Sequence, residues 1–284
     1  MLDDEYDGPF RQLGKQGVRI RKIAVHPKDP TTAWAGGDYF YAYQKGPGWY
    51  RLSNSEISDL KVSPSFPDYP FAAAGNGIAF REPSTIGPPG YLVWDFNYVN
   101  NLYPSALAID PSQPDRILVA SNFTTPNMGI AIDIYSSVDN GLTYQKLSEI
   151  PADNMIENLE ISPSDANIVI ATTKDTRDIS HWALISHDGG ITWTTWLDGL
   201  TGGGADSFLA VGSNSVAYYG GYDGVYLRSL SGSAWLPIGL QGQTILSMAL
   251  SDNTPRFLLA ATDQGLFRLN LAAYSLWLPF VTQH

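Results

Sequence analysis

The octet Ser186-His187-Asp188-Gly189-Gly190-Ile191-Thr192-Trp193 is the stretch that decides the fold of this chain. It has the pattern Ser-x-Asp-x-Gly-x-Thr-Trp, and Ser137-Val138-Asp139-Asn140-Gly141-Leu142-Thr143-Tyr144 repeats it 49 residues earlier. Its carboxylate and hydroxyl groups can hydrogen-bond to nearby backbone groups, and its glycine tolerates a positive φ. The octet therefore predicts a hairpin turn whose final aromatic residue opens the next strand.

Three patterns recur along the chain in the same order. The first is an apolar strand that runs into a turn rich in proline and aspartate, as in Leu107-Ala108-Ile109-Asp110-Pro111. The second is a strand of small residues, such as Phe71-Ala72-Ala73-Ala74-Gly75, and small residues in strands suggest close packing of sheet on sheet. The third is an aromatic residue that opens the last strand of each unit, namely Trp49, Trp94, Tyr144, Trp193, Trp235 and Trp277.

A repeated four-stranded antiparallel unit of about 40–50 residues is typical of a β-propeller. We therefore predict a single all-β domain over residues 1–284, a six-bladed β-propeller of four-stranded antiparallel blades, in preference to seven blades or a β-sandwich. The predicted units are 18–52, 57–99, 104–147, 156–196, 205–238 and 244–280. Residues 1–14 are predicted to be an N-terminal closing segment, because Phe10-Arg11-Gln12-Leu13 resembles an outer strand. However, Leu276-Trp277-Leu278-Pro279-Phe280 could equally complete the last blade and cover its edge.

The two octets resemble the Asp-box (BNR) repeat of sialidases, sortilin-type receptors, xyloglucanases and the photosystem II assembly factor family. In those families the box marks the turns of the blades and takes no part in catalysis. The resemblance thus implies a structural role for Ser137, Asp139, Gly141, Thr143, Tyr144, Ser186, Asp188, Gly190, Thr192 and Trp193. It also implies that ligands meet the opposite face, where the loops from second to third strand lie.

Composition narrows the classes of partner. The net charge of −11 argues against nucleic acid, which requires clustered Lys and Arg. The chain has no cysteine, and its four histidines are scattered, so we predict no metal site and no cofactor. It has no apolar run long enough for a transmembrane segment, and its acidic start does not resemble a signal peptide. We expect an extracytoplasmic protein from the resemblance, while the cytoplasm stays open.

Loops that are longer than the scaffold requires often carry binding residues. The two longest, around 121–128 and 173–181, fall on consecutive units. The candidate binding residues, taken from the loops that follow the second strands, are Asp38, Tyr39, Asn122, Phe123, Lys174, Asp175, Arg177, Tyr222, Asp223 and Asp263.

Catalysis finds little support in the residues. A sialidase requires a triad of arginines, and three arginines of this chain, Arg51, Arg228 and Arg268, are expected at surface positions of outer strands. The leading hypothesis is a non-catalytic binding scaffold that docks a protein partner or a larger assembly through the loop face, with no catalytic residue. The alternative is a carbohydrate-binding or glycosidase-like propeller, related to sialidases or xyloglucanases, that meets a glycan.

Overall fold

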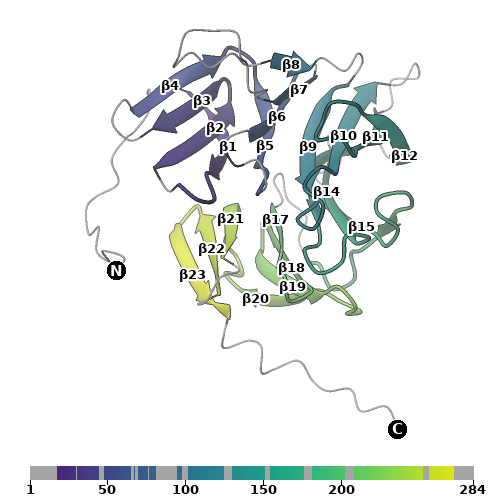
Figure 1. Ribbon diagram of the computed structural model, residues 1–284. Helices are drawn as coiled ribbons and strands as arrows, with labels where there is room; N and C mark the ends of the chain where they lie inside the picture. The colour runs from purple at the N-terminus through teal and green to yellow at the C-terminus, as the bar shows by residue number, and fades with distance from the viewer. Residues whose placement is uncertain are drawn as a thin grey trace.

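The computed structural model consists of six antiparallel sheets arranged as blades around a ring, with the described chain almost entirely in strands and turns (Figure 1). It describes residues 18–29, 31–44, 48–64, 67, 70–75, 77–80, 95–97, 102–124, 130–150, 154–175, 181–201, 208–251 and 256–271. The predicted six-bladed β-propeller is confirmed. Among these residues no helix is long and apolar enough to cross a membrane.

Each blade is a meander of consecutive strands. Blade 1 contains β1 (Ile20–Val25), β2 (Thr32–Gly37), β3 (Phe40–Gln44) and β4 (Gly48–Ser53). Blade 2 contains β5 (Ile57–Val62), β6 (Pro70–Ala74), β7 (Gly77–Phe80) and β8 (Asp95–Asn97). Blade 3 contains β9 (Pro104–Ile109), β10 (Ile117–Thr124), β11 (Ile130–Ser137) and β12 (Gln145–Ile150).

The second half of the ring repeats this plan. Blade 4 contains β13 (Asn154–Ile161), β14 (Val169–Asp175), β15 (His181–Ser186) and β16 (Thr194–Thr195). Blade 5 contains β17 (Phe208–Val211), β18 (Val216–Gly221), β19 (Gly224–Ser229) and β20 (Leu236–Gly239). Blade 6 has three described strands, β21 (Ile245–Ser251), β22 (Phe257–Thr262) and β23 (Gly265–Asn270). The two segments expected to close the ring, 10–13 and 276–280, lie outside the described residues.

The hydrophobic core lies between consecutive blades, and blades 2 to 5 are covered on both faces, whereas Ile23 and Val25 of blade 1 and Leu266 of blade 6 are exposed. Successive residues of a strand point to opposite faces, so Leu118 and Ala120 of β10 pack toward blade 4, while Ile117 and Val119 pack toward blade 2. The small residues of the second strands are buried here, as with Ala120 at 0% exposure. Small side chains let the blades approach closely, as the sequence predicted.

Polar contacts link the inner strands across the ring. Lys22 Nζ on β1 donates to Asn158 Oδ1 on β13 at 3.0 Å, although two blades lie between blade 1 and blade 4 in either direction around the ring. Lys61 Nζ on β5 reaches Glu160 Oε1, also on β13, at 2.6 Å. Burial opposes the charge on Lys61, but the carboxylates around it outweigh that cost and raise its pKa. The blades are therefore held by ion pairs at the axis as well as by apolar packing.

Candidate functional site

The octets form the turns between the third and fourth strands of blades 3 and 4. In the first octet, Ser137 Oγ donates to Asp139 Oδ1 at 2.7 Å and accepts from Gly141 N at 2.9 Å. Thr143 donates to the same carboxylate through its backbone N–H and its hydroxyl. Asn140 and Gly141 have φ of 59° and 83°, a left-handed pair that asparagine and glycine adopt most easily. The side chains of Ser137 and Asp139 thus accept hydrogen bonds from backbone N–H groups of the same turn.

The second octet makes the same contacts. Ser186 Oγ donates to Asp188 Oδ1 at 2.7 Å, and Gly190 N donates to Ser186 Oγ at 2.8 Å. Hydrogen bonds from the Thr192 hydroxyl and N–H, and then from Ser186, hold the pKa of Asp188 at about 2. Trp193 Nε1 donates to Gly190 O at 3.0 Å. The hydrogen bonds of the Asp188 carboxylate are internal to the turn, so Asp188 has a structural role as a hydrogen-bond acceptor.

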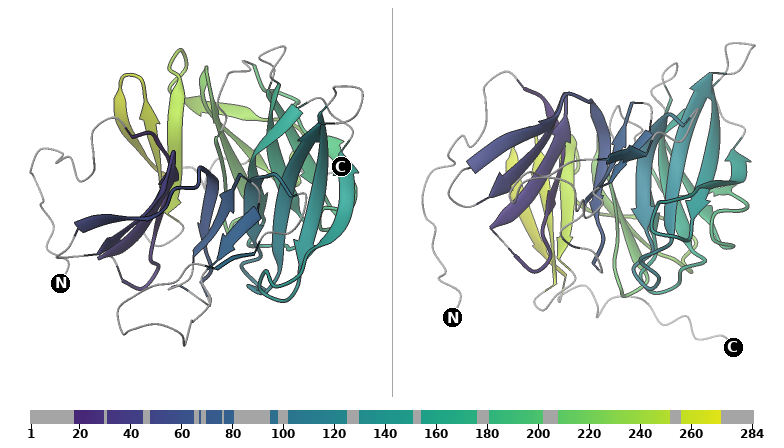
Figure 2. Two further views of the ribbon diagram at one scale, coloured as in Figure 1. Left: turned by 90° about the horizontal axis from the view of Figure 1, so that it is seen from above. Right: turned by 45° about the horizontal axis from the view of Figure 1, so that its top comes forward.

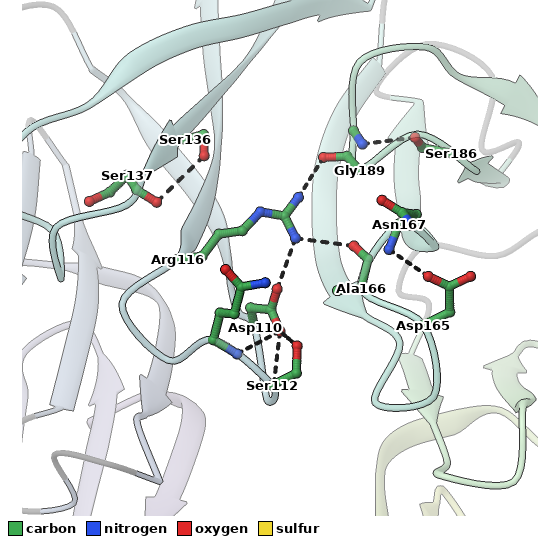
Figure 3. A network of polar contacts seen from close by, with 12 residues as sticks. Asp110, Ser112, Arg116, Ser136, Ser137, Asp165, Ala166, Asn167, Ser186 and Gly189 are labelled. Atoms are coloured by element: carbon green, nitrogen blue, oxygen red, sulfur yellow. Dashed lines mark hydrogen bonds and ion pairs between the residues drawn. The ribbon is translucent and has the colours of Figure 1, made fainter.

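Arg116 joins the octet turn of blade 4 to blade 3 (Figure 3). Its guanidinium donates to Asp110 Oδ2 at 3.0 Å, Ala166 O at 3.1 Å and Gly189 O at 2.8 Å. Burial alone would raise the pKa of Asp110, but hydrogen bonds from Ser112 and Arg116 outweigh it and lower that pKa. The face that carries the octets is therefore cross-braced between blades 3 and 4.

Arg228 does not occupy the outer-strand surface position expected for it. It lies on β19, the third strand of blade 5, and is 6% exposed. Its guanidinium lies 4.6 Å from the ring centroid of Trp196, and its Nε donates to Gly232 O at 3.0 Å. Its side chain is buried against this aromatic ring, which is why strand spacing alone misplaced it. Arg51 and Arg268 are exposed as expected.

The predicted binding residues lie on the opposite face, at the ends where second strands turn into third strands. Asp38 and Tyr39 occupy the β2–β3 turn, Tyr222 and Asp223 the β18–β19 turn, and Asp263 the β22–β23 turn. Asn122 and Phe123 are in the last part of β10, and Lys174 and Asp175 end β14. Arg177 lies outside the described residues. The ring distributes these residues over five blades rather than gathering them at a single point.

Two of the predicted binding carboxylates accept hydrogen bonds from backbone N–H groups near them. Asp38 Oδ2 accepts from Arg19 N at 3.1 Å, and Asp223 Oδ1 accepts from Gly242 N at 2.8 Å. Each bond ties a loop to the segment that precedes or follows a neighbouring inner strand. These contacts give Asp38 and Asp223 a structural role in the described part of the chain.

Asn122 differs from these residues because its side chain has no partner. Both Nδ2 and Oδ1 are shielded from solvent and make no hydrogen bond within the structure described here. Asn122 follows Leu118 and Ala120 at strand spacing, so it points toward blade 4 at the loop end of the apolar core. A buried polar group without a partner costs about 1–3 kcal/mol, which makes this position one to explain.

Thr173 is the counterpart of Asn122 on blade 4. It follows Val169 and Ala171 of the same core, is 1% exposed, and its Oγ1 has no hydrogen-bond partner among the described groups. Two residues next to the pair along or across the strands have exposed side chains, and Met155 points to the opposite face of blade 4 from Thr173. Tyr103, 53% exposed, accepts at its backbone O from Asn122 N at 3.0 Å, and Met155, 37% exposed, precedes Ile156, which pairs with Thr173. We call Tyr103, Asn122, Met155 and Thr173 the loop-face cluster.

Of this cluster the candidate set contained Asn122 alone. Thr173 begins the region 173–181 that the sequence marked as a long loop, and Tyr103 is one of the aromatic residues outside the repeat positions, but neither these two nor Met155 was among the candidate binding residues. Thr173 is distinguished by its unpaired hydroxyl, and Tyr103 and Met155 by their positions next to the unpaired residues. These properties depend on how blade 3 packs against blade 4. Among the residues with described positions, no group of three or more His, Cys, Asp or Glu side chains could hold a metal ion.

Comparison with known proteins identifies the fold and no family. No family model matches the chain, and no curated protein matches its sequence. A GH74 enzyme of Niastella koreensis superposes with a TM-score of 0.58 at 17% identity, over 77% of this chain and 36% of that protein. Sqt1 from Chaetomium thermophilum superposes with a TM-score of 0.59 at 16% identity, over 90% and 70%.

A chain of the outer-coat vertex of COPII on membranes gives a TM-score of 0.61 at 13% identity, covering 89% of this chain and 70% of that one. This chain thus spans about a third of the GH74 enzyme and larger shares of the other two. At these identities the likeness shows the propeller fold alone, which hosts enzymes and assembly proteins alike.

Proposed function

We propose that this propeller is a non-catalytic scaffold that docks a protein partner at the loop face of blades 3 and 4. The observation that carries the proposal is the loop-face cluster, where the strands that carry the unpaired amide of Asn122 and the unpaired hydroxyl of Thr173 adjoin segments that expose Tyr103 and Met155. Because both groups are shielded from solvent in the free protein, a partner supplies their missing hydrogen bonds by opening this end of the core, and each bond made then offsets a cost of about 1–3 kcal/mol. Exposed aromatic and methionine side chains are typical anchors of protein interfaces.

The two faces of the ring differ in a way that supports this proposal. On the octet face, the serine and threonine hydroxyls and the aspartate carboxylates of both octets are hydrogen-bonded within their turns, and Arg116 braces the neighbouring blades. In the first octet, the amide oxygen of Asn140 and the hydroxyl of Tyr144 have no hydrogen-bond partner in the described structure. That face is a rigid support. On the loop face, the unpaired Asn122 and Thr173 border the two longest connections from a second to a third strand, residues 125–129 and 176–180, so the partner is expected there.

The test is a quantitative pull-down with the full chain as bait and a matched pair of variants. Tyr103→Ala/Met155→Ala removes the apolar anchors of the loop-face cluster. Val138→Ala/Ile191→Ala is the control, because these side chains are 76% and 53% exposed on the octet turns of the other face. Each truncated anchor costs about 1 kcal/mol or more, so the first variant, which removes two, is expected to weaken binding of the captured protein about thirtyfold or more.

Retention of the partner by the cluster variant and its loss from the octet variant would move the docking surface to the other face. The captured protein must also bind in a purified two-component titration, since co-purification alone does not identify a docking partner. We further propose an extracytoplasmic location, on the ground of the Asp-box resemblance of the octets. Fractionation of the native cells tests it, and recovery with cytosolic markers would contradict it.

A carbohydrate-binding or glycosidase-like role is the second candidate, and the fold likeness to GH74 enzymes is what favours it. The sequence supplies no equivalent set of aromatic and polar residues in several blades, which a repeated sugar site would require. A glycan array and an assay for release of reducing sugar from xyloglucan separate the two. Binding or hydrolysis at enzyme-like turnover, with no protein partner, would replace the docking proposal with this one.

A further inference from the structure

One junction of the ring lacks the apolar packing that joins the other blades. The described chain has five apolar clusters, and each spans one junction, from blades 1 and 2 round to blades 5 and 6. No cluster of described residues joins blade 6 to blade 1. Figures 1 and 2 show these two blades, in yellow and in purple, as neighbours in the ring. We call their junction the seam.

The inner strand of blade 1 carries the side chains that the other inner strands pack on the preceding blade. Ile23 and Val25 of β1 lie two residues apart, just before the turn to the second strand, and Leu159 and Ile161 hold the same places in β13. The pair of β13 is 0% and 4% exposed in the core shared with blade 3, whereas the pair of β1 is 65% and 57% exposed. The corresponding pairs of blades 2, 3, 5 and 6 also pack toward the preceding blade, namely Leu60 and Val62, Leu107 and Ile109, Leu209 and Val211, and Met248 and Leu250.

An isoleucine in front of a bulge shows the same contrast. In β5, β13 and β21 the strand register shifts directly after Ile57, Ile156 and Ile245, which are 0%, 1% and 0% exposed. The register of β1 shifts in the same way after Ile20, yet Ile20 is 41% exposed. Blade 1 therefore has the local structure of a packed inner strand with no blade against it.

The packed junctions show what such an isoleucine meets on the preceding blade. At the junction of blades 1 and 2, a Cβ atom at Gly36 of β2 would lie 2.8 Å from Cβ of Ile57. At the junction of blades 5 and 6, a Cβ atom at Gly220 of β18 would lie 3.1 Å from Cβ of Ile245. In both cases a small residue of the second strand faces the isoleucine of the next blade.

Blade 6 has a small residue at the same place. Ala261 of β22 pairs with the residue two positions after the isoleucine of its own blade, as Gly36 does in blade 1. Its cross-strand partner Leu266 shares its face and is 61% exposed. The face of blade 6 that looks toward the seam is thus apolar and uncovered, like the face of blade 1.

We propose that blade 6 closes on blade 1 through these two faces, with Ala261 against Ile20, so that the described open ring and a closed ring are two states of this chain. Closing buries Ile20, Ile23, Val25 and Leu266. Burial of apolar surface drives this step as it drives the packing at the other five junctions. Exposed apolar faces of this kind in a soluble protein mark surfaces that take a packing partner.

Lys22 already holds the inner strand of blade 1 at the axis in the open state. Its Nζ donates to Asn158 Oδ1 of blade 4 at 3.0 Å and lies 3.7 Å from Asp59 Oδ1 of blade 2. Blade 1 is also packed on blade 2, and the described part of blade 6 is packed on blade 5. Closing therefore requires the two free faces to swing together and leaves the existing junctions in place.

Disulfide trapping tests the closed state, because the chain has no cysteine of its own. Ile20→Cys/Ala261→Cys places two thiols across the seam. The corresponding Cβ positions of the packed junctions lie 2.8 and 3.1 Å apart, so the closed ring brings this pair within reach of a disulfide, whose Cβ atoms are about 3.8 Å apart. Mild oxidation of the full chain is followed by thiol titration, non-reducing electrophoresis and mass spectrometry of the linked peptides.

Two matched variants serve as controls for this pair. Gly220→Cys/Ile245→Cys lies at the packed junction of blades 5 and 6 and gives the rate at which a closed junction links. Val25→Cys/Ala261→Cys uses the same residue of blade 6 but the far end of β1, about 16 Å further along the strand. We expect a linked monomer for the seam pair and the packed-junction pair, and free thiols for the Val25 pair.

Free thiols in the seam pair, under conditions that link the packed-junction pair, would overturn the proposal. Disulfide-linked dimers of the seam pair would overturn it as well, because a second copy would then cover the face of blade 1. Equal linking of the Val25 pair would do the same, since linking would not depend on the proposed contact.

A variant without cysteine tests the closure independently. Ile23→Asp places a charge on a side chain that is exposed in the open ring and buried in the closed one. It is therefore expected to lower the melting temperature by about 3 °C or more, whereas Val138→Asp, at a position 76% exposed on an octet turn, is expected to leave it unchanged. Equal melting temperatures for the two variants would contradict closure of the seam.

Discussion

Replacement of Arg116 is the sharpest test of how the octet face is held together. Its guanidinium makes three hydrogen bonds, to Asp110, Ala166 and Gly189, and its side chain is 18% exposed. At a net value of about 1 kcal/mol for each bond, Arg116→Met removes about 3 kcal/mol of stability while keeping the apolar stem. Asp110, with a fully buried side chain, also loses its cation, which adds to the cost.

This magnitude converts into a measurable melting shift. Unfolding entropy is about 2.1 cal/mol/K per residue, so for 284 residues a loss of about 3 kcal/mol lowers Tm by about 5 °C. Differential scanning calorimetry of the full chain measures it. Arg116→Lys keeps the charge but lacks the planar fork, so it is expected to melt between Arg116→Met and wild type.

Two further variants make the reasoning refutable. Arg51→Met replaces an exposed arginine and is expected to change Tm little, as is typical of surface positions. In a double-mutant cycle, Asp110→Asn combined with Arg116→Met is expected to cost less than the sum of the single changes. Strict additivity, or a Tm for Arg116→Met equal to that of Arg51→Met, would show that this cross-brace contributes nothing.

Three other outcomes follow from single side chains. Thr173→Val is expected to raise Tm, because it removes an unpaired buried hydroxyl, whereas Thr172→Val is expected to lower it, since Thr172 Oγ1 accepts from Asn158 Nδ2 at 3.0 Å. The folded pKa of Asp188, about 2, lies below the ordinary value of about 3.9, so its contribution is present above pH 4 and lost as pH falls toward 2. Asp188→Asn should therefore flatten the acid limb of Tm against pH, with the exposed Asp115→Asn as control. Trp235→Ala empties a position that is 1% exposed and should cost about 3–5 kcal/mol in denaturant unfolding.

The strands and the order of the blades were predictable because they depend on local chemistry. The octets specify their turns through hydrogen bonds between residues two to four positions apart, such as Ser186 to Asp188 and Thr192 to Asp188. Small residues also identify the second strands in the sequence, because each blade packs closely on its neighbour through them. Six repeats of these local signals are enough to predict a closed ring of blades.

The loop-face cluster and the Arg116 brace could not be predicted in this way. Arg116 contacts Ala166 and Gly189, which lie 50 and 73 positions away, and no spacing rule connects them. Asn122 entered the candidate set because a long loop follows it, not because its amide lacks a partner. Asp38 and Asp223 entered because they follow second strands, and both proved to accept hydrogen bonds from backbone N–H groups. The position of a residue in a loop therefore predicts the face on which it lies. Which residues of that face lack a hydrogen-bond partner is known only from the structure.

The contrast between the two faces also explains how such a scaffold can change its partner without losing its fold. Stability on the octet face comes from bonds that close within a turn or reach the adjacent blade, and these involve no loop that follows a second strand. The unpaired Asn122 and Thr173 lie at the other end of the same inter-blade core, one strand step beyond its last small residues, Ala120 and Ala171. Substitution there alters what a partner meets while the apolar core beneath stays intact. The octet face thus keeps the turns of the fold in place, while the loop face is where substitutions can change a partner at little cost to the core.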